Sequence, residues 1–330
     1  MRGRKPPERL RVLVLADANT RTGLGHLMRT RALVEALGES RPVETLYVGR
    51  FDSRESAWIR QWGYRTRGSR DRQRARILRH CLQEFRPHIA IVDAYRRLET
   101  ELRLTQSAGA CTVLFGDRRT VGIAPVTIRV NALEGRGRVP PRQAIRHLVG
   151  LRYVCVRPEI VKRARRARKP EAATCIVSLG GGRTPRLRPL VSMLQKEVPM
   201  KRWIVLGSVP AQGSGIPSTQ IVSRPADVAA ALARATVAVS AAGTTAWELA
   251  CLGVPAVLWP MVPNQQPIAR ALDHRTSHSC GHWRDIPRAL AELIADPARL
   301  RHLSQGARKL IDGLGARRLA TAVLTLVCPR

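Results

Sequence analysis

The chain has 330 residues, of which 44% are hydrophobic and 25% charged, values that are ordinary for a globular protein. It contains 57 lysines and arginines against 24 acidic residues, a formal net charge of +33. No run approaches the roughly 18 apolar residues of a membrane span, and the basic N-terminus lacks the pattern of a signal peptide. The seven cysteines are scattered and never paired as C-x-x-C, which argues against a disulfide framework or a zinc site and favours a cytoplasmic location.

The positive charge is compatible with nucleic acid, an anionic membrane surface or a phosphorylated small ligand as partner. Aromatic residues make up only 4% of the chain and are not interleaved with the basic runs, so a stacking platform for single strands is not indicated. We therefore expect no specific nucleic-acid partner and at most a weak contact with an anionic membrane surface.

The first informative stretch is a strand, a turn and a helix. Residues 10–16 form an apolar run rich in Val and Leu, which predicts a buried strand. Apolar residues then recur at helical spacing from about Gly25 until Gly38, which supplies a C-terminal stop. Such a junction directs free backbone N–H groups and the positive end of the helix dipole towards the carboxyl end of the strand.

The turn itself matches neither of two familiar phosphate loops. The dinucleotide fingerprint needs a glycine where Met28 stands, and no Gly-Lys-Ser/Thr follows for a Walker loop. Instead, His26 lies in the first turn of the helix with Arg29 three residues later on the same face. The positive helix end favours a neutral imidazole that can accept a proton. An isolated histidine here is most often a surface residue, but two glycines and an arginine nearby favour a catalytic or ligand-binding role for His26.

The rest of the chain alternates strands and helices in two blocks separated by a basic segment. This alternation predicts βαβ units and mainly parallel sheets, and therefore an α/β protein of two Rossmann-like domains. The basic segment reads as a solvated interdomain linker more readily than as a nucleic-acid patch. The expected organisation is an N-terminal domain over 1–152, a linker over 153–172 and a C-terminal domain over 173–330, whose final helix from Leu314 to Val327 can return across the first domain.

A second strand, turn and helix occupies the C-terminal block. Residues 235–240 predict a strand, Gly243 lies in the turn, and residues 244–252 predict a helix that Gly253 ends. Thr245 and Glu248 have the spacing of a capping box, which is a structural role for both. A Gly-Thr-Thr turn at a helix start is equally suited to hold a diphosphate with backbone and hydroxyl donors. Three uncharged amides, 264–266, follow the next strand and are expected at the same edge of the sheet.

Together these stretches resemble the UDP-sugar hydrolases of the pseudaminic acid pathway and the related spore-coat polysaccharide proteins. That family has the GT-B architecture, in which a nucleotide-sugar lies in the cleft between two α/β domains. The motifs that carry the resemblance run in the same order along the chain: Asp17 to Arg29 with G-x-G-H-x-x-R, residues 91–95 (Ile-Val-Asp-Ala-Tyr), 153–159, 177–181, 239–248, Asn264 with Gln265, and 312–315.

The resemblance implies hydrolysis of a UDP-activated amino-deoxy sugar by water at the anomeric carbon, with no metal or other cofactor. His26 would be the base for that water. Asn264 and Tyr95 would orient the sugar and the water, and Glu248 would hold the uridine ribose. The substrate-binding residues that the resemblance implies are Asp17, Gly23, Gly25, Arg29, Tyr95, Gly180, Gly181, Ser240, Gly243, Thr244, Thr245, Glu248, Asn264 and Gln265.

Two departures from the family pattern concern the sugar. The family's second motif usually reads Asp-His-Tyr, and here Ala94 replaces the histidine; its usual Asp-Asp after the next strand is Gly116-Asp117. The sequence therefore favours a UDP-sugar as substrate without selecting which sugar, and it leaves the oligomeric state open. A glycosyltransferase with a UDP-sugar donor is the alternative, since the peptidoglycan GlcNAc transferase shares the fold. A non-catalytic nucleic-acid-binding protein built on the run 162–169 is a third reading, although no groove-reading motif is present.

Overall fold

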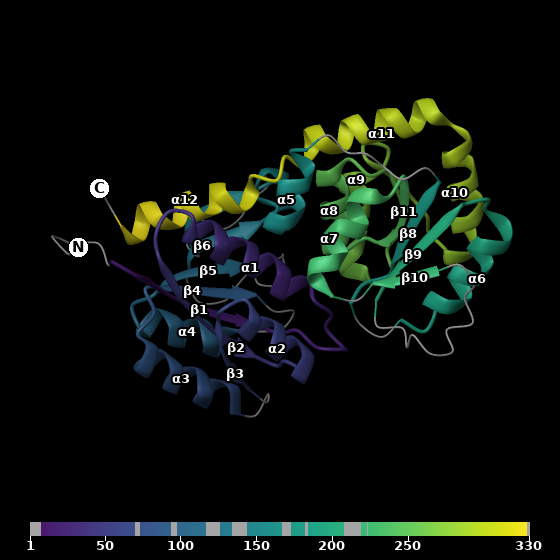
Figure 1. The fold of residues 1–330 in the computed structure, drawn as a ribbon. Helices are drawn as coiled ribbons and strands as arrows, with labels where there is room; N and C mark the ends of the chain where they lie inside the picture. The colour runs from purple at the N-terminus through teal and green to yellow at the C-terminus, as the bar shows by residue number, and fades with distance from the viewer. Residues whose placement is uncertain are drawn as a thin grey trace. The chain divides into compact units, whose positions relative to one another are not determined.

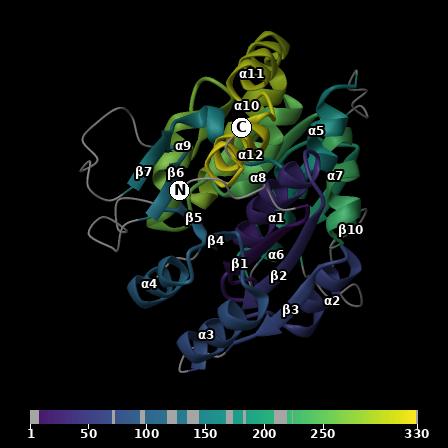
Figure 2. The same ribbon diagram turned by 90° about the vertical axis from the view of Figure 1, so that its left-hand side faces the viewer.

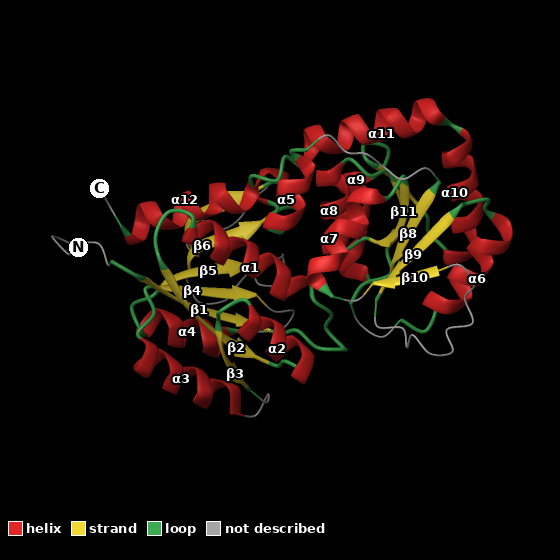
Figure 3. Cartoon of the chain, viewed as in Figure 1, coloured by secondary structure: helices red, strands yellow, loops and turns green. Residues whose placement is uncertain are grey.

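The computed structural model describes residues 8–69, 73–93, 98–116, 126–133, 144–166, 173–181, 184–207, 219–222 and 224–328. The chain divides into two compact units. Unit 1 comprises Met1–Cys155 together with Leu314–Arg330, and unit 2 comprises Val156–Gly313. Each unit is an α/β structure with one parallel sheet (Figures 1 and 3). In the part of the chain that is described, no helix is both long and apolar enough to cross a membrane.

The sheet of unit 1 has seven strands in the order β3-β2-β1-β4-β5-β6-β7, and all its neighbouring strands pair in parallel. The strands are β1 (Leu10–Ala16), β2 (Val43–Gly49), β3 (Arg65–Gly68), β4 (Ile89–Asp93), β5 (Cys111–Phe115), β6 (Val126–Asn131) and β7 (Ala144–Val149). The helices are α1 (Gly25–Gly38), α2 (Ser53–Gln61), α3 (Arg74–Phe85), α4 (Glu99–Ser107) and α12 (Gly315–Val327), with a 3-10 turn η3 (Leu151–Tyr153).

Strand β1 shows why the sheet of unit 1 is covered on both faces. Its residues are almost all buried, and successive side chains point to opposite faces. Val12 and Val14 belong to the apolar cluster that includes α1 and α12, whereas Leu13 and Leu15 belong to the cluster that includes α3 and α4 (Figure 2). A continuous apolar run is therefore what a central parallel strand requires.

The last helix belongs to unit 1 although it follows unit 2 in the sequence. Helix α12 packs along α1, and its Leu319 and Val323 are fully buried in the same cluster (Figure 1). Its first residue is Gly315, where an added Cβ would lie 2.1 Å from the carbonyl oxygen of Val154. Only glycine permits this close approach of two backbone segments.

The sheet of unit 2 has six parallel strands in the order β10-β9-β8-β11-β12-β13. They are β8 (Thr174–Ser178), β9 (Arg202–Leu206), β10 (Thr219–Val222), β11 (Val237–Ala241), β12 (Ala256–Trp259) and β13 (Ser277–Ser279). The helical elements are α5 (Pro158–Ala164), α6 (Leu187–Glu197), α7 (Pro225–Arg234), α8 (Thr244–Leu252), η4 (Pro263–Gln265), α9 (Gln266–Leu272), η5 (Trp283–Asp285), α10 (Ile286–Ala295) and α11 (Pro297–Leu310).

Part of the segment expected as a linker is helical. Helix α5 lies inside 153–172, begins with Pro158 at its first turn and buries Ile160 completely. It contacts α7 and α8 and so belongs to unit 2. The run of arginines concealed this helix because it offers only one buried apolar position in seven residues.

Candidate functional site

In unit 1 the direction of strand order reverses between β1 and β4. Ligands of open parallel sheets bind at such a switch point, outside the carboxyl ends of the strands. The loop after β1 contains Gly23 and leads into α1, which begins at Gly25 and carries His26 as its second residue. Gly23 has φ +73°, a left-handed conformation that favours glycine. Asp93 is the last residue of the neighbouring strand β4.

His26 and Asp93 form a buried pair at this switch point. The His26 side chain is 2% exposed and Asp93 is fully buried. His26 Nδ1 lies 2.6 Å from Asp93 Oδ1. Because a carboxylate only accepts hydrogen bonds, Nδ1 carries the proton, and in a neutral imidazole the lone pair is then on Nε2. The pair has the arrangement of a general base held in one tautomer by a carboxylate.

Arg29 completes the charge balance around Asp93. Its Nε donates to Asp93 Oδ2 at 2.5 Å, and its Nη2 contacts Oδ1. Burial alone would raise the pKa of Asp93, but Arg29 and His26 outweigh burial and lower that pKa to about 2. Asp93 is thus a carboxylate at physiological pH. The Arg29 guanidinium, which the resemblance assigns to substrate binding, is bonded to this carboxylate.

Sequence reasoning did not select Asp93 as a site residue. The available signal was its position as the final residue of an apolar strand, one strand away from the His26 loop. Tyr95 and Ala94, from the same predicted motif, lie outside the described residues.

Asp17 is occupied by contacts within unit 1. Its Oδ1 accepts the backbone N–H of Arg50 at 2.9 Å. Arg74, which is 1% exposed, donates to the same carboxylate through Nη2 at 2.5 Å and Nη1 at 3.2 Å. Asp17 therefore stabilises the local chain conformation in the structure. The sequence analysis did not identify Arg74 as its partner.

Unit 2 has its own switch point, between β8 and β11. Gly180 and Gly181 follow β8, and Gly243 precedes α8 after β11. Thr244 and Thr245 are half-buried in the first turn of α8, which contains no acidic residue. An added Cβ on Gly243 would meet no atom within 4 Å, so the space beside the turn is open. Backbone N–H groups, two hydroxyls and the positive end of α8 make this turn suitable for an anion such as a diphosphate.

Two residues predicted in this loop have internal partners. Ser240 is fully buried and its hydroxyl donates to the carbonyl oxygen of Ala241 at 2.9 Å. The expected capping box is wrong, because Gly243 is the N-cap of α8 and no side chain caps it. Glu248 instead accepts two hydrogen bonds from the buried Arg157, at 2.5 and 2.7 Å. Burial alone would lower the pKa of Arg157, but the Glu248 carboxylate raises it above its ordinary value.

The amide residues lie in η4, after strand β12. Gln265 Oε1 accepts the backbone N–H of Met261 at 2.9 Å and so stabilises the turn. Asn264 is half-buried in the same turn. Of this pair, Asn264 is therefore the better candidate for contact with a ligand.

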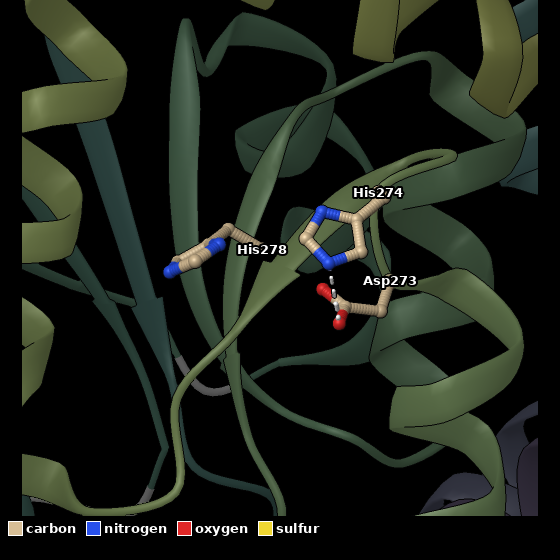
Figure 4. A group of neighbouring side chains, drawn as sticks. All are labelled: Asp273, His274 and His278. Carbon is tan, nitrogen blue, oxygen red and sulfur yellow. Dashed lines mark ion pairs between the residues drawn. The ribbon is translucent and has the colours of Figure 1, made fainter.

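Within the described residues, one further group has metal-ligating side chains: Asp273, His274 and His278, whose ligand atoms lie within 4.8 Å of one another (Figure 4). The ring of His274 is turned to Asp273, with Nε2 3.3 Å from Oδ2. Asp273 Oδ1 accepts the N–H of Ser279, and His278 Nδ1 accepts from Arg299 at 3.2 Å. The positively charged Arg299 guanidinium, bonded to His278, disfavours a divalent metal ion at this group. The hydrogen bond from Ser279 to Asp273 stabilises the turn between α9 and β13.

Two all-parallel α/β units, each with a glycine-containing loop at its switch point, define the GT-B fold, as the sequence predicts. No family model matches the chain. It is similar to the spore coat polysaccharide biosynthesis protein SpsG of Bacillus subtilis (strain 168), at 24% identity over 344 residues, covering 96% of this chain and 98% of that protein.

Solved structures share the fold over nearly the whole chain. The spinosyn forosaminyltransferase SpnP has a TM-score of 0.65 at 14% identity, covering 96% of this chain and 99% of that one. Phytolacca americana UGT2, solved with UDP-2fluoro-glucose and pterostilbene, has a TM-score of 0.65 at 12% identity, covering 98% and 99%. These similarities show the GT-B fold over nearly the whole chain.

Proposed function

We propose that this protein transfers a sugar from a UDP-sugar donor to a hydroxyl acceptor in the assembly of a surface polysaccharide. The observation that carries the proposal is a buried His–Asp pair at the switch point of a GT-B fold. The relative named for spore coat polysaccharide biosynthesis supports the pathway class, and the structural neighbours named as transferases or solved with UDP-sugars support the reaction class.

Unit 2 holds the nucleotide in this proposal. The first turn of α8 offers Thr244, Thr245 and unpaired helix N–H groups, which suit the negative charge of the diphosphate. That charge increases at the β-phosphate oxygen as the bond to the sugar breaks. Donors placed at this point stabilise the transition state more than the bound donor and so accelerate the reaction.

Unit 1 supplies the base. His26 Nε2 takes the proton of the acceptor hydroxyl while its oxygen forms a bond to the anomeric carbon. The bond from that carbon to the diphosphate breaks, and its electron pair leaves with UDP. The imidazolium that results is stabilised by Asp93, whose hydrogen bond to Nδ1 also fixes the ring orientation.

Hydrolysis requires the same base to act on water, so the acceptor decides between the two reactions. The test measures UDP release from a panel of UDP-sugars with and without a panel of saccharide acceptors, with mass spectrometry of the product. We expect UDP release to rise at least tenfold with the right acceptor and the product mass to equal the acceptor plus the donor sugar. Equal rates with and without every acceptor would instead indicate a hydrolase, and no release from any donor would contradict both readings.

A further inference from the structure

Arg29 lies three residues after His26 on α1 and is held in place by two strands of the sheet. Its Nε donates to Asp93 Oδ2 at 2.5 Å, and its Nη2 contacts Oδ1 of the same carboxylate at the end of β4. Its guanidinium carbon also lies 5.3 Å from the centre of the Phe115 ring, at the end of β5. A bidentate ion pair and an aromatic contact together fix the position of this planar group.

The guanidinium of Arg29 lies beside the nitrogen of His26 that bears the proton. Arg29 Nη2 is 3.3 Å from His26 Nδ1, and that nitrogen donates to Asp93 Oδ1. Asp93 is fully buried, so solvent screens the charges of the three groups only weakly. Asp93 alone would stabilise an imidazolium, whereas a guanidinium at this distance opposes a second positive charge. The charge state of His26 therefore depends on both neighbours.

Other titratable groups on the elements around α1 are uncharged or bonded elsewhere. Burial raises the pKa of the Cys155 thiol to about 12, so this group beside Arg29 and Asp93 is neutral. Burial also raises the pKa of Tyr47 on β2 well above its ordinary value. Asp17, which follows β1, is bonded to a buried arginine as described above. Asp93 and Arg29 are thus the charges that the structure places in contact with His26.

We propose that Arg29 is a positioning residue that keeps His26 in its neutral, proton-accepting form by sharing the carboxylate of Asp93. An imidazolium has no lone pair and does not accept a proton, so a base at this point must be neutral. This role differs from the substrate binding that the sequence resemblance assigns to Arg29. Its consequence for catalysis rests on the proposed function, but the charge state of His26 is measurable without turnover.

The test follows the imidazole nitrogens of His26 by NMR while the pH is varied, with the signals identified by their absence from His26→Asn. In Arg29→Gln the midpoint of the titration should move to higher pH by about one unit or more, because Asp93 then acts alone. In Asp93→Asn it should move to lower pH, because the guanidinium then acts alone. Loosening of the structure would instead move both midpoints in the same direction.

Arg317→Gln is the matched control. It removes an arginine from an exposed ion pair with Glu39, at the other end of α1 and about 20 Å from His26, and should leave the midpoint unchanged. Arg29→Met removes the same charge and provides the measurement if Arg29→Gln does not fold. An unchanged or lower midpoint in the Arg29 variant, or an equal shift in Arg317→Gln, would overturn the proposal. Shifts in the same direction in the Arg29 and Asp93 variants would also overturn it.

Turnover distinguishes this role of Arg29 from the proposed function. If His26 is the base, UDP release by Arg29→Gln should fall about tenfold on the acid limb for each unit of the shift and recover at higher pH, with UDP affinity unchanged. A His26 midpoint that moves while the acid limb stays in place would support the role of Arg29 and contradict His26 as the base. A loss of UDP release that no pH restores, with the His26 midpoint unchanged, would overturn the role of Arg29 and assign it to substrate binding.

Discussion

The two switch points have the same topology and different chemistry. In unit 1 the point between β1 and β4 carries a hydrogen-bonded network of the buried Asp93 and His26 with the half-buried Arg29. In unit 2 the point between β8 and β11 carries an uncharged turn of glycines and threonines at a helix start. A fixed carboxylate and imidazole suit proton transfer, whereas open N–H and hydroxyl donors suit an anion. The fold thus provides two topologically equivalent places, and under the proposal the residues in the loops give a different task to each.

The largest effect should come from His26, which the proposal makes the base. His26→Asn keeps a polar side chain of similar bulk but removes the proton acceptor. Positioned acid–base catalysis contributes about 10²–10⁴-fold, so turnover should fall by that factor. UDP affinity and melting temperature should change little, because the proposal assigns nucleotide binding to unit 2. Normal turnover would show that His26 is not the base, and joint loss of UDP affinity and stability would show that it is structural.

A second comparison concerns the buried ion pair of unit 2, between Arg157 and Glu248. Glu248→Gln removes from the buried Arg157 the carboxylate that accepts two of its hydrogen bonds, and losing one partner of a buried ion pair costs about 3 kcal/mol of unfolding free energy. The double variant Arg157→Met with Glu248→Leu removes both charges and should recover most of that loss. Urea unfolding of the wild type, the single variant and the double variant measures the three unfolding free energies. An unchanged stability in Glu248→Gln would mean that the ion pair contributes nothing to the folded state.

The buried carboxylate of unit 1, Asp93, should make the stability of the protein depend on pH. Folding lowers the pKa of Asp93 from 3.8 to about 2, so this carboxylate stabilises the folded state fully above about pH 4. That contribution, about 2 kcal/mol, is lost as the pH falls towards 2. We therefore expect the unfolding free energy of the wild type, measured with urea, to fall between pH 6 and pH 2 by about 2 kcal/mol more than that of Asp93→Asn. Equal losses would mean that Asp93 has an ordinary pKa in the folded state.

A smaller effect should come from the turn of unit 2. Thr245→Val removes one hydroxyl and preserves the side-chain shape. A hydrogen bond to a charged group contributes about 1.5–3 kcal/mol, so UDP should bind roughly tenfold more weakly or worse in calorimetry. Thr321→Val is the matched control, since its hydroxyl on α12 bonds only the carbonyl oxygen of Arg317. Equal affinities in the two variants would remove Thr245 from the nucleotide site.

The sequence predicts the elements at both switch points well, because local signals define them. Residues 10–16 are a strand as expected, α1 begins at Gly25, and Gly253 ends α8 with φ +69°. The cap of α11 is also local: Asp296 Oδ1 accepts the N–H of Arg299 at 2.8 Å. Strand β3 was missed because its four residues, Arg65–Gly68, lie at the edge of the sheet and carry no apolar pattern.

The contacts that decide function were not predictable in the same way. His26 and Asp93 are 67 residues apart, and Arg157 and Glu248 are 91 apart. Spacing along the chain gives no information on such pairs. Glu248 had a plausible local partner in Thr245, but it pairs instead with the buried Arg157, which donates two charge-assisted hydrogen bonds at 2.5 and 2.7 Å.

The division of tasks between the two switch points is tested most directly by amide chemical shifts on titration with UDP. The account predicts saturable shifts concentrated at Gly180, Gly181 and residues 243–246, with the amides of His26 and Asp93 largely unaffected. Shifts concentrated at His26 and Asp93, or no saturable shifts at either place, would contradict it.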